Sequence, residues 1–428
     1  MKTISAALLM GAAASVLALA SGAQAQNQNS QNQNRGNQRP NNAWPYATMG
    51  RSAPVLAVVG DVACQPGEEP SGESAGENCD GDTVQNLRLS QAVTAQQIEN
   101  MKPDLVALVG DEQYQVGQYS DFENSYELSY GAFKFITRPA PGNHEFYTEH
   151  GATGVAGYGY FSYFNGVQHN ADGSIMTATV ANNPDTGGTF TQPVPYSDGQ
   201  AGHFEQSGGL GNTVPAGGSV GVGDGWYSYN LGAWHLISLN IECETQPGLC
   251  SNTGSWFAAE LAWLKNDLAA NHSACTLAYW HQPTYSAANS LSEEGTTAQA
   301  FWQLLYQYGA DVVLNGHDHL YARYRPLDPS GNFDPKKGIR EFIVGTGGET
   351  LDTVVTNGTE SNPGGQANFN AVNLEASTGE FWGVMGLTLN QNGYAWDFES
   401  ALKDPAQTTG PASFSDKGVG TCHGPVNR

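Results

Sequence analysis

The stretches VLAVVGDVAC at residues 55–64 and LVALVGDEQY at residues 105–114 share one pattern, an apolar, β-prone run that ends in Gly-Asp. Three later segments carry further polar side chains: GNHE at 142–145, WHQP at 280–283 and GHDH at 316–319. The last two follow the apolar runs TLAYW and DVVLN. Strands that end in loops bearing ligand-type residues predict an α/β fold with its active site at the carboxyl edge of a sheet.

Together the segments supply oxygen and nitrogen ligands for two metal ions: Asp61, Asp111, Tyr114, Asn143, His281, His317 and His319. A carboxylate that bridges two dications holds them about 3.5–4 Å apart, and we expect Asp111 to be this bridge. Such a pair lowers the pKa of bound water and stabilises both oxygens of an in-line displacement. A lone Asp or His is more often a turn or core residue, so the prediction of a phosphoesterase site rests on five segments in one order.

The order GD, GDxxY, GNH[DE], a single His and GHxH resembles the calcineurin-like metallophosphoesterases. Within them it is most similar to the purple acid phosphatase branch and its secreted bacterial relatives. The resemblance covers most of residues 52–400 and implies a four-layer α-β-β-α sandwich with two packed mixed sheets. It also implies hydrolysis of phosphate monoesters by attack of metal-bound hydroxide, without a phosphoenzyme.

Carried over position by position, the resemblance implies two metal positions that share Asp111: one held by Asp61, Tyr114 and His319, the other by Asn143, His281 and His317. It places His144 beside the metals, as proton donor to the leaving group or as a transition-state contact. In the same resemblance, Glu145 orients His144.

Two positions set this chain apart from much of the wider superfamily. Most members begin with DxH, but Ala63 stands where that histidine would be, and Tyr114 offers the missing ligand. A phenolate suits trivalent iron, so the resemblance implies Fe(III) there, with Fe(II), zinc or manganese at the histidine-rich position. Relatives usually carry YER after GHxH, whereas Tyr321, Ala322 and Arg323 follow here, so the acidic residue of that motif is absent.

The remaining histidines lack comparable context, and we predict that they are structural or solvated: His150, His169, His203, His235, His272 and His423. Tyr285, in HQPTYS, has two interpretations that stay open. It either lines a phosphate pocket or packs as a core aromatic residue.

The first 25 residues predict a secretory signal peptide, because MKT leads into an apolar run that ends at Ala23-Gln24-Ala25. That run of about 15 residues is short for a membrane span, and no other segment approaches the roughly 20 residues needed. We therefore expect a secreted or periplasmic protein without a membrane span. Residues 26–50 are rich in Gln and Asn and predict a disordered linker, which either attaches to a surface or is a simple flexible leader.

Residues 51–402 are predicted to form one catalytic domain, followed by a C-terminal tail at 403–428. Within the domain, residues 165–225 form a Gly-rich insertion with almost no hydrophobic periodicity. The insertion either reaches over the metal site and influences substrate choice or is a surface loop without a role.

Apolar spacing predicts three helices, at 83–100, 255–270 and 296–309. In the first of these, Leu87, Val93 and Ile98 are expected to face inward. The alternating aromatic and aliphatic residues of 226–241 fit a sheet edge that becomes buried.

Six cysteines in an exported chain indicate disulfides, although the number alone allows 15 connectivities. We expect three pairs: Cys64–Cys79, Cys243–Cys250 and Cys275–Cys422. Because Cys64 lies three residues from Asp61, a thiolate metal ligand is the alternative to a disulfide at that position.

The formal net charge of −24, from 17 Lys and Arg against 41 Asp and Glu, argues against nucleic acid as a partner and leaves a small phosphate ester as the expected substrate. One rival interpretation is a phosphodiesterase or nucleotide hydrolase of the same fold. Another is a non-catalytic extracellular binding protein that contains metal. His144 and Glu145 argue against the latter, because neither is required to hold the metals. The natural substrate and the oligomeric state stay open.

Overall fold

The computed structural model describes residues 53–64, 83–84, 87–146, 157–180, 190–195, 225–242, 256–286, 288, 296–355 and 371–424. The predicted signal peptide and linker, residues 1–50, lie outside these ranges. Among the helices of the described ranges, none is both long and apolar enough to cross a membrane.

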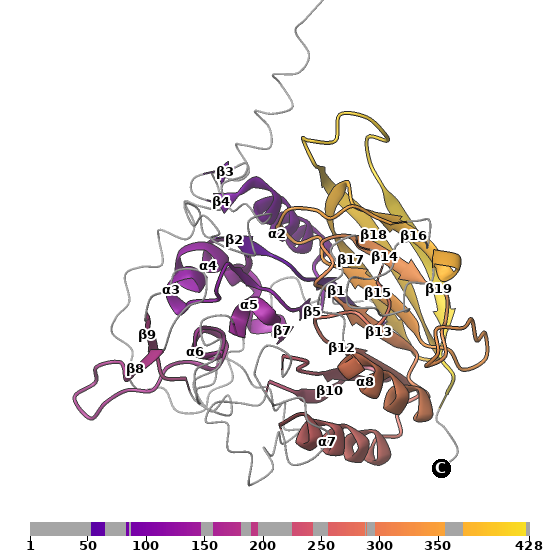
Figure 1. Cartoon of the computed structure of the whole chain (residues 1–428), viewed down its shortest axis with the longest axis horizontal. Coiled ribbons are helices and arrows are strands. Elements are labelled where there is room, and N and C mark those ends of the chain that lie inside the picture. The colour runs from indigo at the N-terminus through magenta and orange to yellow at the C-terminus, as the bar shows by residue number, and fades with distance from the viewer. Residues whose placement is uncertain are drawn as a thin grey trace, which may run out of the picture.

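Two mixed β-sheets pack face to face at the centre of the fold (Figure 1). In the first, β1 runs parallel to β5, and β5 runs parallel to β7. The other three strands are antiparallel to their neighbours. The spatial order is β19 (Ser415–Thr421), β18 (Gly393–Lys403), β17 (Phe381–Asn390), β1 (Val55–Val59), β5 (Leu105–Val109) and β7 (Thr137–Ala140).

The second sheet has seven strands, of which β11, β12, β13 and β15 are parallel. Its spatial order is β10 (Tyr227–Leu231), β11 (Trp234–Ser238), β12 (Cys275–Tyr279), β13 (Val312–Asn315), β15 (Arg340–Val344), β14 (Tyr321–Tyr324) and β16 (Leu374–Thr378). The prediction for 226–241 is confirmed, because β10 is the edge strand and every residue of the adjacent β11 is buried.

The strands read as continuous apolar runs because both of their faces are covered. Along β1, Leu56 and Val58 belong to the core between the two sheets. The alternate residues Ala57 and Val59 belong to the core beneath the helices. The same alternation runs through the other central strands, so each sheet contributes one face to each core.

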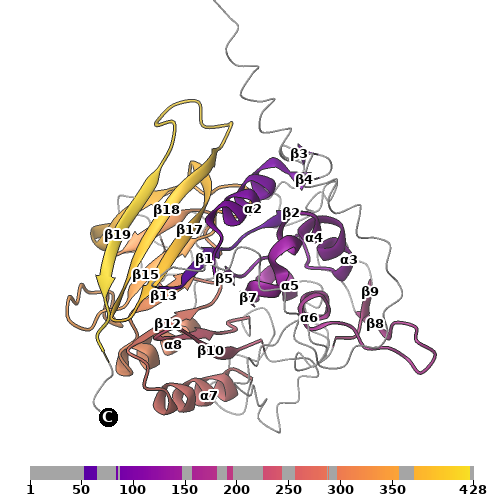
Figure 2. The same ribbon diagram turned by 180° about the vertical axis from the view of Figure 1, so that it is seen from behind.

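Helices cover the outer faces of both sheets (Figures 1 and 2). Helix α2 (Leu89–Met101) packs on β17 and β18 of the first sheet. Helices α7 (Trp256–Ala270) and α8 (Thr296–Gln307) cover the second sheet, where Leu264 and Trp302 share a core with Ala278. The predicted helices at 255–270 and 296–309 are confirmed to within two residues, and so is the α-β-β-α sandwich.

The predicted helix at 83–100 begins later than expected. Residues Thr83–Val84 (β3) and Leu87–Arg88 (β4) form a short antiparallel pair, and α2 starts at Leu89. Ile98 is buried, but Val93 is only half-buried and Leu87 precedes the helix. Two of the three inward residues were predicted wrongly because the buried face of α2 is partly polar: Ser90 and Thr94 donate hydrogen bonds to the carbonyls of Gly348 and Gly347. Apolar periodicity does not detect such a face.

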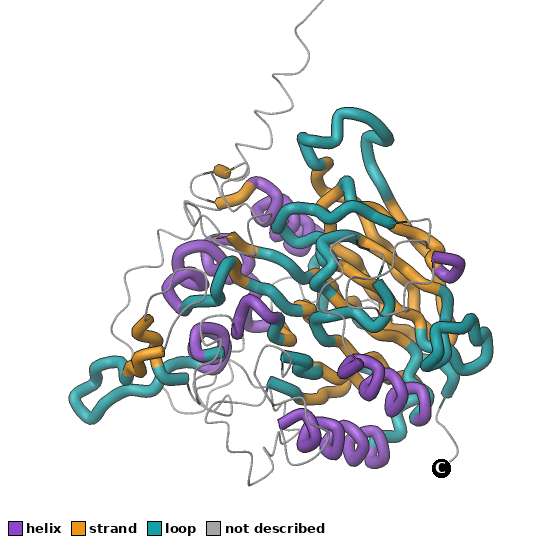
Figure 3. Tube along the Cα trace, viewed as in Figure 1, coloured by secondary structure: helices purple, strands orange, loops and turns teal. Residues whose placement is uncertain are grey.

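Short elements gather on one side of the sheets (Figures 1 and 3). They are β2 (Ala63–Cys64), β6 (Gln113–Tyr114), α3 (Tyr119–Asp121), η1 (Phe122–Tyr126), α4 (Glu127–Ser129), η2 (Tyr130–Ile136), α5 (Asn143–Phe146) and α6 (Tyr158–Asn165). A short 3-10 helix, η4 (Ala371–Asn373), precedes β16.

Part of the predicted insertion at 165–225 is ordered as a β-hairpin. Strands β8 (Thr177–Val180) and β9 (Phe190–Pro193) pair antiparallel. The hairpin packs on α6, where Ser162 donates a 2.8 Å hydrogen bond to the carbonyl of Pro193. Residues 181–189 and 196–224 lie outside the described ranges.

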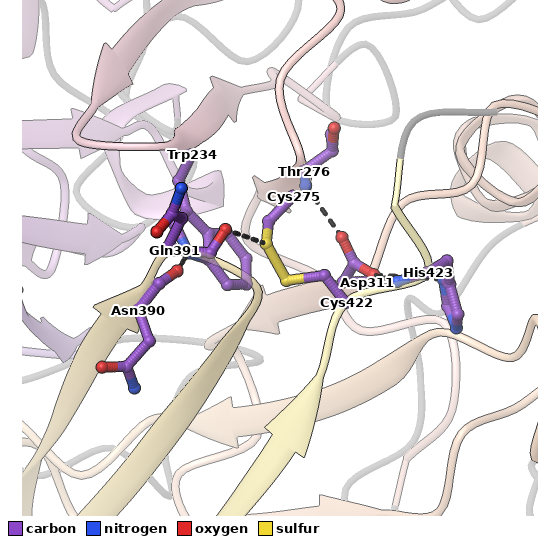
Figure 4. Close-up of a disulfide and its surroundings, with 8 residues drawn as sticks. All are labelled: Trp234, Cys275, Thr276, Asp311, Asn390, Gln391, Cys422 and His423. Carbon is purple, nitrogen blue, oxygen red and sulfur yellow. Dashed lines mark hydrogen bonds and ion pairs between the residues drawn. A yellow bond between two sulfur atoms is a disulfide. The ribbon is translucent and has the colours of Figure 1, made fainter.

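The segment expected to be a C-terminal tail, 403–428, contributes β19 to the first sheet instead of lying beyond it. The disulfide Cys275–Cys422 is confirmed and joins the end of this strand to the start of β12 (Figure 4). Cys64 is also disulfide-bonded, which removes it as a thiolate ligand. Its expected partner Cys79 and the expected pair Cys243–Cys250 lie outside the described ranges.

Candidate metal centre

The predicted ligands lie where parallel strands end. Asp61 follows β1 and Asp111 follows β5, both in the first sheet. His281 and His317 follow β12 and β13 of the second sheet, and Asn143 is the first residue of α5 after β7. Because the parallel strands of both sheets present their carboxyl ends to the same region, loops distant in sequence meet there.

Three of these residues have backbones in the left-handed region. The φ angles are 57° for Asp61, 50° for Asp111 and 68° for His317. A residue with a side chain costs about 1–3 kcal/mol in such a conformation, and these conformations concentrate at functional sites. Strands β1, β5 and β13 therefore each end in a sharp turn that directs a ligand-type side chain into the common region.

Three side chains converge around the phenol of Tyr114. Its Oη lies 2.9 Å from Oδ1 of Asp61, 2.9 Å from Oδ2 of Asp111 and 3.0 Å from Nε2 of His319. Nε2 of His319 is also 3.3 Å from Oδ1 of Asp61. We call Asp61, Tyr114 and His319 the tyrosine cluster.

A second group meets the other side of Asp111. Nε2 of His281 lies 3.0 Å from Oδ2 of Asp111. Nδ1 of His317 lies 3.3 Å from that nitrogen and 3.2 Å from Oδ1 of Asn143. We call Asn143, His281 and His317 the histidine cluster. A single oxygen, Oδ2 of Asp111, therefore belongs to both clusters.

These separations fit two cation coordination shells. With metal–ligand bonds of about 2.0–2.1 Å, neighbouring ligand atoms lie about 2.9 Å apart in an octahedral shell and about 3.3 Å apart in a tetrahedral one. The observed contacts between donor atoms, from 2.9 to 3.3 Å, fall in this range. All seven predicted ligands are brought together, and their role as metal ligands stays a prediction.

The contacts of the imidazole rings determine which nitrogen faces the site. Nδ1 of His281 donates to the carbonyl of Val109 at 2.9 Å, and Nδ1 of His319 donates to the carbonyl of Thr350 at 2.7 Å. In both rings Nε2 is therefore the nitrogen that faces the other predicted ligands and would present its lone pair to a cation. Proteins usually orient a metal-binding histidine in this way, with the ring nitrogen that does not bind metal donating a hydrogen bond to a carbonyl or carboxylate.

The buried charges of the site shift the pKa values of its histidines in opposite directions. Burial disfavours a charged His281, yet the nearby Asp111 carboxylate raises the pKa of the His281 ring to about 10. Burial and the adjacent His281 charge hold the pKa of His317 well below its usual value. Because a cation at the histidine cluster has to displace the His281 proton, we expect its affinity to increase with pH.

His144 sits beside this centre. Its Nδ1 lies 2.6 Å from the carbonyl oxygen of Gln115, and its Nε2 lies 3.9 Å from Oδ2 of Asp111. The ring packs on Tyr114 with 4.2 Å between centroids. The structure thus gives the orienting contact to Gln115 rather than to Glu145, whose carboxylate binds backbone N–H groups instead.

Sequence reasoning missed the segment that follows β15. The N–H of Gly347 donates to the carbonyl of Gly60 at 2.9 Å, and the N–H of Glu349 donates to the backbone carbonyl of Asp61 at 3.1 Å. The same segment continues to Asp352, whose carboxylate accepts the N–H of His319 at 2.9 Å. The signal was present in the sequence, because FIVGTGGE at 342–349 is another apolar run that ends in a Gly-rich loop at the same edge.

The other aromatic and histidine side chains have structural contacts. Tyr285 is buried, donates to the carbonyl of Asp328 at 3.0 Å and packs on Trp302, so the core interpretation is the one that holds. Nε2 of His235 lies 2.6 Å from Asp267. Of the remaining five histidines, His169 and His272 are exposed, His423 contacts Asp311, and His150 and His203 lie outside the described ranges.

The Tyr-Ala-Arg segment that replaces YER is structural. Ala322 is fully buried in β14. Arg323 binds Asp416 of β19 through Nε at 2.7 Å and stacks on Trp396 at 4.8 Å. It therefore links β14 of the second sheet to β19, the edge strand of the first sheet.

A family model described as calcineurin-like phosphoesterase matches residues 55–321. The chain belongs to this family. It is 34% identical to purple acid phosphatase 15 of Arabidopsis thaliana over 115 residues, which is 25% of this chain and 20% of that protein. It is 29% identical to an acid phosphatase of Aspergillus ficuum over 154 residues, 27% of this chain and 24% of that protein.

Among solved structures, this calcineurin-like phosphoesterase aligns with a purple acid phosphatase from yellow lupin seeds. The TM-score is 0.49 at 18% identity, over 86% of this chain and 54% of that chain. The resemblance to the purple acid phosphatase branch, predicted from the motifs, is confirmed. The matched region spans only about a fifth to a quarter of the curated relatives' own length.

Proposed function

We propose that the protein is an exported, binuclear metal-dependent phosphoesterase that hydrolyses phosphate monoesters. One observation carries the proposal: Oδ2 of Asp111 lies 2.9 Å from Oη of Tyr114 and 3.0 Å from Nε2 of His281. An oxygen at the junction of two ligand clusters is what a bridged pair of cations requires.

The two clusters suit different cations. The tyrosine cluster offers a phenol and a carboxylate, which favour trivalent iron, and the histidine cluster offers neutral donors suited to Fe(II), zinc or manganese. When bound, the two ions would supply Lewis acidity toward the phosphoryl oxygens and lower the pKa of the attacking water.

His144 is the candidate proton donor to the leaving oxygen. Because Nδ1 is held by the carbonyl of Gln115, Nε2 is the ring atom turned toward Asp111 and the site. In the imidazolium form, Nε2 carries a proton that can be transferred to the departing alkoxide, which prevents its return to phosphorus.

Charge favours small monoesters as substrates. A phosphate monoester is a dianion near neutral pH, so it interacts with two polyvalent cations more strongly than a monoanionic diester does. The net charge of −24 repels polyanions at long range, which disfavours polymeric substrates. The signal-like leader and the disulfide support export to an oxidising compartment.

The first test is the metal content and visible spectrum of the mature protein purified without added metal. We expect close to two metals per chain, including iron, and a charge-transfer band that Tyr114→Phe removes. p-Nitrophenyl phosphate should be hydrolysed faster than bis(p-nitrophenyl) phosphate. A protein with two metals but faster diester hydrolysis would favour the phosphodiesterase, and a protein without metal or activity would overturn the proposal.

A further inference from the structure

Glu145 lies where two ligand-bearing loops meet. Its Oε2 accepts the N–H of Asp111 at 3.0 Å and that of Gly142 at 2.8 Å, and its Oε1 accepts the N–H of Gln113 at 3.1 Å. The side chain is fully buried. One carboxylate thus ties the loop of the bridging residue to the helix that carries Asn143.

The carboxylate of Asp111 in turn binds the backbone of the helix that carries Glu145. Its Oδ1 accepts the N–H of His144 at 2.9 Å, while Glu145 accepts the N–H of Asp111. The carboxylate of each residue thus accepts a backbone N–H from the loop of the other. A capping box at a helix N-terminus has the same reciprocal pattern of bonds. Gly142 permits this approach, because a Cβ at that position would lie 2.2 Å from Oδ1 of Asp111.

The exchange determines which oxygen of Asp111 faces the two clusters. Oδ1 is engaged by the backbone of His144, so only Oδ2 is left at the junction with Tyr114 and His281. Rotation of the carboxylate would break the bond to His144. The left-handed backbone of Asp111 is held in turn by its own N–H bond to Glu145.

We propose that Glu145 is a positioning residue that, by holding the loop of Asp111, leaves only Oδ2 of that carboxylate at the junction of the two clusters, so that loss of Glu145 weakens the binding of the second cation. The inference rests on the proposed function, because it concerns the same two-cation site. It assigns Glu145 to the geometry of the bridge and not to the orientation of His144.

The test is calorimetric titration of the metal-free full chain with Mn²⁺, for wild type and Glu145→Gln. The glutamine keeps the size of the side chain and one acceptor oxygen, but its amide nitrogen would face the N–H of Gln113, so one bond is lost. We expect the first Mn²⁺ to bind with little change and the second to bind about 10–100-fold more weakly. Electron paramagnetic resonance should show the coupled pair replaced by isolated Mn²⁺.

Glu260→Gln is the matched control. Glu260 is a fully buried carboxylate that accepts a backbone N–H, that of Asn240, at 2.7 Å. This hydrogen bond goes to Asn240, which is not a predicted ligand, so the substitution measures the general cost of replacing a buried carboxylate that holds a backbone N–H. Glu145→Asp keeps the charge but shortens the reach, and we expect a smaller loss of the second Mn²⁺, which gives a second variant if Glu145→Gln does not fold.

The outcomes separate the inference from the proposed function. Wild type that binds fewer than two Mn²⁺ would overturn both. Wild type with two Mn²⁺, together with unchanged second-site affinity in both Glu145 variants, would overturn the positioning role and leave the phosphoesterase proposal standing. Equal losses of affinity for the second Mn²⁺ in Glu145→Gln and Glu260→Gln would also overturn the positioning role.

Discussion

Loss of the disulfide between Cys275 and Cys422 should destabilise the protein strongly without disturbing the predicted metal centre. The two cysteines are 147 residues apart in sequence. In the chain-entropy model, closing a loop of that length removes about 5 kcal/mol of entropy from the unfolded state at 25 °C. Because the magnitude comes from the unfolded chain, it depends little on the contacts that the sulfur atoms make in the folded state.

The disulfide lies away from the predicted ligands. Cys275 is the first residue of β12, and His281 follows the other end of that strand. Five residues of strand separate the two ends by roughly 16 Å. Figure 4 shows the bridge beside Asp311 and the turn at Asn390 and Gln391, which carry none of the predicted ligands.

The assay is urea unfolding of Cys275→Ala/Cys422→Ala, followed by circular dichroism and paired with metal analysis of the folded protein. We expect a loss of about 3–5 kcal/mol in the free energy of unfolding, with metal content unchanged. Val419→Ala, on an exposed position of β19, is the control and should change stability by less than about 0.5 kcal/mol. A loss below about 1 kcal/mol in the double variant would refute the loop-entropy reasoning.

Three further substitutions test the site and its support. His144→Ala should lower turnover of p-nitrophenyl phosphate about 10²–10⁴-fold in steady-state kinetics while metal content stays at wild-type level. Gly142→Ala should abolish metal binding in titrations, because its methyl would lie 2.2 Å from Oδ1 of Asp111; full metal content would contradict this. Burial raises the pKa of Asp311 from 3.8 to about 6, so the folded state holds this proton more tightly than the unfolded chain. The free energy of unfolding should therefore fall by about 3 kcal/mol between about pH 4 and 7, and Asp311→Asn should remove that dependence in urea titrations.

The central strands could be predicted from the sequence because both faces of each are apolar and a ligand-type residue marks each end. The edge strand β19 could not, since SDKGVGT shows no apolar face. Two of its three inward positions are glycines, Gly418 against Trp396 and Gly420 against Tyr394, and the third is Asp416. The apolar surface at this edge is supplied by the neighbouring strand, so β19 itself carries no hydrophobic pattern.

For the site, side-chain chemistry was predictable and backbone chemistry was not. Asp, His and Tyr residues at strand ends indicate a metal site by their residue types. The carbonyls of Gln115 and Thr350, which orient His144 and His319, belong to the main chain and leave no mark in composition. Only the fold brings them to the imidazole rings.

The two aspartates that open the motifs work in the same way. Asp61 directs Oδ1 toward Tyr114 and uses Oδ2 to accept the N–H of His317 at 3.1 Å. Asp111 directs Oδ2 to the same phenol and uses Oδ1 for the N–H of His144. In each case one oxygen faces the cluster and the other fastens the next ligand loop, which offsets the cost of the left-handed backbone. Because the predicted ligands hold one another in place through these bonds, we expect cation binding to require little rearrangement and its free energy to add directly to that of folding.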